Sequence, residues 1–141
     1  MEVILNRVEH LIPQKQPFVM IDKLLFYQPT KVTSNLLVTS GNIFVDNECL
    51  QEPGIIENMA QTVALHTGYA YHLKNEPTPT GYLGSIKKIN IYQLPKVGTT
   101  IVSKAEILQE FNGVFLVEVS VFDTGSDLCA QGQFKTVIAR S

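Results

Sequence analysis

The sequence predicts an α+β fold, because one long helical segment comes early and a series of strand-like segments follows it. Residues 55–74 carry apolar side chains at helical spacing. Residues 82–138 form segments that are apolar or that alternate between apolar and polar side chains, and turn signals separate these segments. Among the turn signals, Asn112-Gly113 is the strongest for a two-residue hairpin. This order favours an antiparallel sheet that packs on a single helix.

Each element has its own local signal. Residues 4–12 are mixed in character and predict a short helix that ends before Pro13, whereas residues 18–27 and 32–39 are rich in β-formers and predict strands. Later strands are expected over residues 82–92, 100–111, 114–122 and 128–138. Six residues of the long helix share one face, which is expected to pack on the sheet: Ile56, Met59, Ala60, Val63, Thr67 and Ala70.

Length and composition restrict the classes of protein that are possible. The 141 residues suit one domain over residues 1–141, which leaves no room for a separate cofactor-binding module, and no cofactor is expected. A hydrophobic fraction of 45% against 17% charged residues excludes a disordered chain. Eleven Lys and Arg against 13 Asp and Glu give a net charge of −2, which argues against nucleic acid as a partner.

Targeting signals and metal-binding patterns are not recognisable in the sequence. Cys49 and Cys129 are far apart and belong to no cysteine or histidine cluster, so neither a disulfide framework nor a metal site is expected. The start of the chain lacks the pattern of a signal peptide, and no segment has the apolar length needed to span a bilayer. We therefore expect no membrane association and a cytoplasmic location.

Three motifs together carry a resemblance to a known family. They are residues 11–22 (LIPQKQPFVMID), residues 57–61 (ENMAQ) and residues 94–98 (LPKVG). In combination they resemble the FabZ-type 3-hydroxyacyl-[acyl-carrier-protein] dehydratases. The resemblance implies the hotdog fold, in which an antiparallel curved sheet wraps around one long central helix.

Within this group, the helix motif is most similar to the dehydratase-like proteins of aryl-polyene and flexirubin pigment biosynthesis. Residues 54–61 (GIIENMAQ), followed by Ala64 and Gly68, match their motif better than that of FabZ itself. The resemblance implies an acyl thioester on acyl carrier protein as substrate, in fatty-acid or polyene biosynthesis. It also implies a homodimer, or a heterodimer with a dehydratase paralogue that bears a catalytic histidine.

Four residues at the start of the helix are the candidate site. By resemblance, Glu57 matches the catalytic acid of the family; its alternative role is that of a carboxylate favoured by the helix dipole. Gln61 is one turn further on and either orients Glu57 or caps a polar edge. Gly54 and Ile55 are expected to bind substrate through free backbone N–H groups at the helix start, although Pro53-Gly54 can equally serve only to begin the helix.

The catalytic histidine of the family is missing. Residues 42–52, where the resemblance places it, contain no histidine, and the remaining weak candidate there for a base is Asp46. His66 falls on the opposite side of the helix from Glu57, and His72 is about 22 Å away along the axis. We expect these two and His10 to be structural or exposed.

Other functions and partners also fit the pattern. A hotdog acyl thioesterase needs only Glu57 to activate water, and a non-catalytic acyl-binding subunit needs no base at all. Unpaired edge strands predict a dimer. Carrier protein is expected on a basic edge near Lys15, Lys87, Lys88 and Lys96, unless these are simply scattered, solvated lysines.

Overall fold

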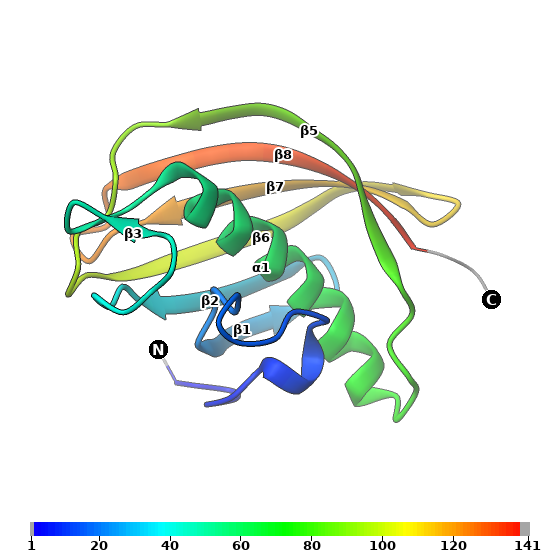
Figure 1. Cartoon of the computed structure of the whole chain (residues 1–141). Helices are drawn as coiled ribbons and strands as arrows, with labels where there is room; N and C mark the ends of the chain where they lie inside the picture. Colours follow the sequence, from blue (N-terminus) through cyan, green and yellow to red (C-terminus); the bar gives the residue numbers. More distant parts are fainter. Residues whose placement is uncertain (1, 139–141) are drawn as a thin grey trace.

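Helix α1 (Glu52–Leu73) crosses the concave face of a curved six-stranded antiparallel sheet in the computed structural model, which describes residues 2–138 (Figure 1). The sheet order is β1-β2-β6-β7-β8-β5. Its strands are β1 (Lys23–Gln28), β2 (Lys31–Leu37), β5 (Gly81–Ile91), β6 (Thr100–Phe111), β7 (Val114–Phe122) and β8 (Leu128–Ile138). A two-stranded hairpin of β3 (Val45–Asp46) and β4 (Cys49–Leu50) precedes the helix. The α+β hotdog architecture expected from the sequence is confirmed.

Alternation along the strands places the apolar face of the sheet against the helix. On β7, Val117, Val119 and Val121 are buried, whereas the residues between them are only half-buried. At the β6–β7 turn, Asn112 and Gly113 have φ angles of 51° and 79°, so both occupy the left-handed region that a type I′ hairpin requires. The alternation and the hairpin predicted from the sequence are both confirmed.

The segments before the helix differ from the prediction. The expected helix over residues 4–12 is only a 3₁₀ turn, η1 (Glu9–Leu11), and Leu5 forms a β-bridge with Leu24 instead. The strand expected from residue 18 begins only at Lys23. Its early part is not paired in the sheet because helix side chains take the hydrogen bonds of Phe18 and Met20.

The helix prediction is right in position and only partly right in orientation, because two of the six residues predicted to pack on the sheet, Met59 and Val63, are buried and the other four are half-buried. Helix α1 begins at Glu52, a few residues earlier than expected, because Pro53 fits the first turn, where its missing N–H needs no partner. The helix face that is buried most deeply is rotated about the helix axis by roughly a third of a turn relative to the predicted apolar stripe. It includes polar residues: the buried helix residues are Gly54, Ile55, Asn58, Met59, Gln61, Thr62, Val63, Leu65 and Gly68.

Candidate active site

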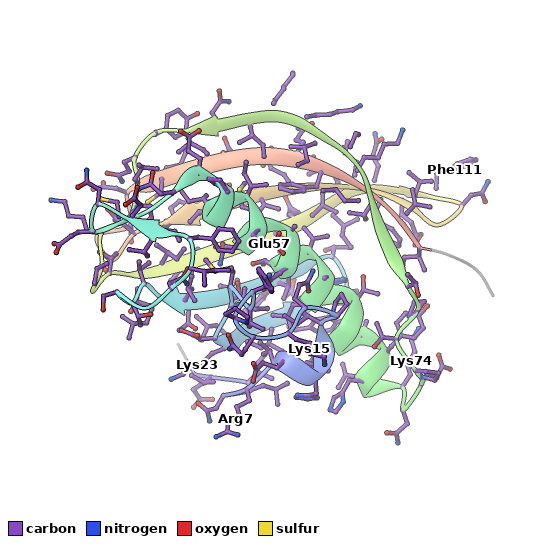
Figure 2. The ribbon with its side chains drawn as sticks, viewed as in Figure 1. Arg7, Lys15, Lys23, Glu57, Lys74 and Phe111 are labelled. Atoms are coloured by element: carbon purple, nitrogen blue, oxygen red, sulfur yellow. The ribbon has the colours of Figure 1, made fainter. Side chains whose placement is uncertain are left out.

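Glu57 and Gln61 form a hydrogen-bonded pair on α1 (Figure 2 shows Glu57 on the helix). They are four residues apart and therefore lie on one helix face. Gln61 Nε2 donates to Glu57 Oε1 at 2.8 Å and also to the Phe18 carbonyl at 2.8 Å, while Gln61 Oε1 accepts the Met20 N–H at 2.6 Å. Of the two roles considered for Gln61, this geometry fits the one in which Gln61 orients the Glu57 carboxylate.

The amides at the helix start are not free, contrary to the expectation for Gly54 and Ile55. Both N–H groups donate to the Gln51 carbonyl, at 3.0 and 3.1 Å. A Cβ at Gly54 would lie 2.5 Å from Phe44 Cβ and 2.6 Å from Leu50 Cδ1, so glycine is needed here for packing. The positive end of the helix dipole still lies at this point, and substrate binding by Gly54 and Ile55 stays a prediction.

The loop that lacks the histidine is ordered by side-chain amides. Asn42 Oδ1 accepts the Phe44 N–H at 2.8 Å, and Gln51 Nε2 donates to the carbonyls of Asp46 and Cys49. These bonds hold the β3–β4 hairpin next to the helix start. Asp46 lies on β3 and is exposed, and its role as a substitute base stays a prediction.

The three histidines lie on the second half of α1 and in the segment beside it. His66 Nε2 is 2.9 Å from the Gln28 carbonyl, and the ring stacks on Tyr27 with the centroids 5.0 Å apart. Burial lowers the pKa of His66, and hydrogen bonds to the backbone of Gln28 and Pro29 offset part of this effect. His10 and His72 are exposed and pack edge to face at 5.8 Å. All three positions agree with the structural or exposed roles expected from the sequence.

An apolar groove of about 400 Å³ lies along α1, in line with the helix face that carries Glu57. Ala60 and Ala64 follow Glu57 on the same helix face at intervals of three and four residues, and both line the groove. Its walls come from residues 10–14, from the start of β5 and from the end of β8. The lining residues include Leu11, Ile12, Val63, Thr67, Leu83 and Phe134.

Half of the helix stripe that was predicted to pack on the sheet lines this groove. Ala60, Val63 and Thr67 belong to that stripe, and they form the floor of the groove. The apolar face that these residues share was therefore predictable from the sequence, but their place in a groove was not. The burial of Asn58 was not predictable either, because a polar residue inside a helix motif carries no local sign that it will be buried.

The sheet ends in an edge strand with exposed apolar side chains. Among the described residues, β5 is paired only with β8, and its Leu83 and Ile86 are exposed. Lys87 and Lys88 lie on this strand, whereas Lys15 lies on the other side of α1 (Figures 1 and 2). Lys96 forms a β-bridge with Cys49. The lysines expected to form one basic edge are thus divided in a single chain, because Lys15 and the Lys87–Lys88 pair lie on opposite sides of α1.

Residues 2–138 contain neither a candidate membrane-spanning helix nor a candidate metal site. No helix in this range is long and apolar enough to cross a membrane. Within the same range, the His, Cys, Asp and Glu side chains form no group of three or more that is arranged to hold a metal ion.

Comparison with known proteins places this geometry in a family. Residues 6–140 match the family model described as ApeP dehydratase, in the ApeP-like group. The sequence matches no curated protein.

Solved structures show the same fold at low sequence identity. The dehydratase heterocomplex ApeI:P from Xenorhabdus doucetiae matches with a TM-score of 0.86 at 16% identity, over 96% of this chain and 92% of that one. The uncharacterized protein PH1136 from Pyrococcus horikoshii matches with a TM-score of 0.72 at 18% identity, over 100% and 97%. A hypothetical thioesterase with coenzyme A from Streptococcus pneumoniae TIGR4 matches with a TM-score of 0.68 at 12% identity, over 84% and 87%.

Proposed function

The chain belongs to the ApeP-like dehydratase family, and from this premise we propose that it is the Glu57-bearing subunit of a 3-hydroxyacyl-[acyl-carrier-protein] dehydratase. One observation carries the proposal. The Glu57 carboxylate is oriented by Gln61 at one end of a row of small residues that leads into the apolar groove. We infer one hotdog domain over residues 1–141, and the cytoplasmic location expected from the sequence stays a prediction.

The proposed chemistry divides elimination of water between two groups. A base removes the α-proton, and an acid protonates the β-hydroxyl as it leaves, which forms a double bond and one water. Because Gln61 holds Glu57 Oε1, the other carboxyl oxygen is the one that contacts the β-hydroxyl. The acyl chain then extends from Glu57 past Ala60 and Ala64 into the groove.

The base is proposed to come from a partner subunit. Neither residues 42–52 nor the second half of α1 brings a histidine to Glu57. The structural neighbour from X. doucetiae is described as a heterocomplex, which supports a heterodimer with a histidine-bearing paralogue in preference to a homodimer. The β5 edge, with its exposed Leu83 and Ile86, is the surface on which we place that partner. Acyl carrier protein would deliver the substrate.

A hotdog acyl thioesterase is the second candidate function. Glu57 can activate water against a thioester without a histidine, and the structural neighbours include a hypothetical thioesterase with coenzyme A. A non-catalytic acyl-binding subunit is the third reading, and it predicts binding with no turnover in any combination.

The test compares the purified chain with its mixture with a histidine-bearing paralogue, using a 3-hydroxyacyl and a saturated acyl thioester. We expect slow dehydration by the chain alone, because loss of a general base costs about 10²- to 10⁴-fold in rate, and fast dehydration by the mixture. Hydrolysis of the saturated thioester by the chain alone would instead establish the thioesterase. Binding without turnover in both samples would leave only the acyl-binding role.

A further inference from the structure

We infer that Asn58 is a positioning residue for Glu57, and that it acts through Met20 and Gln61; this inference rests on the proposed function. Asn58 is fully buried at the interface between α1 and the sheet. Its Nδ2 donates to the Met20 carbonyl at 2.8 Å, and its Oδ1 accepts the Ser103 hydroxyl at 2.6 Å. The side chain therefore joins α1, β6 and the segment before β1.

The orientation of the Asn58 amide is determined by its partners. A backbone carbonyl only accepts hydrogen bonds, so the nitrogen of Asn58 must face Met20. The oxygen then faces Ser103, whose hydroxyl has a hydrogen to donate. Both ends of a buried amide are satisfied, which makes this arrangement rigid and its loss costly.

Met20 transmits that rigidity to Gln61. Asn58 holds the Met20 carbonyl, and Gln61 Oε1 accepts the Met20 N–H, so two side chains on one helix face bind both polar groups of the same residue. An amide N–H can only donate, so it sets the direction of the Gln61 side chain.

The direction of the Gln61 amide decides which atom faces Glu57. With Oε1 on Met20, Gln61 Nε2 points a hydrogen at Glu57 Oε1 and the other at the Phe18 carbonyl. With the amide reversed, an oxygen would face the carboxylate and repel it. Asn58 therefore keeps Met20 at the position where Gln61 gives Glu57 a donor.

The same buried network offers a matched control. Thr62 is also fully buried; it donates to the Asn58 carbonyl and shares a hydrogen bond of 2.8 Å with Ser34. The Thr62 side chain contacts neither Met20 nor Gln61 through a hydrogen bond among the described residues. Thr62→Val removes a buried hydroxyl from the network. It leaves in place the hydrogen bonds by which Asn58 and Gln61 hold Met20.

The experiment uses the dehydratase assembled with its histidine-bearing partner, in a double-mutant cycle of Asn58→Ala with Glu57→Gln. We expect Asn58→Ala to lower kcat about tenfold with KM unchanged, the size of one oriented hydrogen bond. In the Glu57→Gln background the same change should cost nothing further, because the residue acts through that carboxylate. Thr62→Val should lower stability without lowering kcat.

A milder variant and a second readout cover the case in which Asn58→Ala does not fold. Ser103→Ala keeps the Asn58 donor but releases its oxygen, and it should show a smaller kcat loss with the same non-additivity. Exchange of the Met20 amide hydrogen, followed by NMR, should accelerate in Ser103→Ala by more than its loss of global stability explains, and in Thr62→Val only by the amount that its loss of stability explains. An additive loss in the double variant, or an unchanged kcat with unchanged exchange, overturns this inference alone. An assembled enzyme indifferent to Glu57→Gln overturns the proposed function and this inference together.

Discussion

Gly68 allows the N-terminal segment to cross α1 in direct contact with the helix backbone. A Cβ at this position would overlap the carbonyl oxygen of Leu11 and lie 2.9 Å from its carbonyl carbon. Backbone atoms cannot rotate away as the end of a flexible side chain does. Gly68→Ala therefore forces the segment away from the helix, and two opposing free-energy terms decide the outcome.

The favourable term is small. Alanine stabilises a helix interior by about 1 kcal/mol relative to glycine. The unfavourable term begins at about 1–3 kcal/mol for overpacking and grows if the segment detaches. Detachment would expose Val8, Leu11 and Ile12, which are 1%, 4% and 5% exposed, at about 1.5–3 kcal/mol for each side chain. We expect a net loss of about 2 kcal/mol or more in the free energy of unfolding.

Urea denaturation measures this difference through the transition midpoint at an unchanged slope. Gly41→Ala is the control, because a Cβ there meets no heavy atom within 4 Å, and it should change stability by less than about 0.5 kcal/mol. Leu11 and Ile12 also line the groove, so Gly68→Ala should weaken acyl binding as well. A Gly68→Ala protein more stable than the wild type would refute the reasoning.

Three further predictions concern the site and its surroundings. Glu57→Gln in the mixed dimer should lower kcat by about 10²- to 10⁴-fold and change acyl binding far less, and full activity would contradict the assigned role. Burial lowers the pKa of His66 in the folded protein. As the pH falls below about 6.5, His66 is therefore protonated first in the unfolded chain, and the free energy of unfolding decreases with each further fall in pH. His66→Gln should flatten the dependence of the urea midpoint on pH between about 7 and 5. An unchanged dependence on pH would count against this contribution of His66. Gln14→Leu removes a buried amide oxygen that has no hydrogen-bond partner among the described residues. Because Gln14 lines the groove, the substitution should raise the melting temperature and tighten the binding of alkyl chains; a lower melting temperature would argue against this.

The elements that were predictable have local causes. The hairpin at Asn112-Gly113 follows from two residues that tolerate positive φ, and the buried face of β7 follows from alternation. The contact between Glu57 and Gln61 follows from their spacing on a helix. These signals lie within a few residues of the feature that they predict.

The features that were not predictable depend on partners far away in the sequence. Asn58 is buried because Ser103, 45 positions later, and Met20, 38 positions earlier, satisfy its amide. These bonds turn a polar face of α1 toward the sheet, and three of the six residues of the predicted apolar stripe, Ala60, Val63 and Thr67, line the groove. No periodicity in the helix itself contains that information. The amides of Gly54 and Ile55 were misjudged because the helix begins before Pro53.

The grip of α1 on residues 18–20 also has an evolutionary consequence. Gln61 and Asn58 bind the main-chain carbonyl of Phe18 and the main-chain carbonyl and N–H of Met20. Every amino acid offers the carbonyl, and every amino acid except proline also offers the N–H. The Phe18 side chain itself is 54% exposed. Substitutions at Phe18 can therefore accumulate and alter the surface next to Glu57, while the anchor that orients the carboxylate is inherited unchanged.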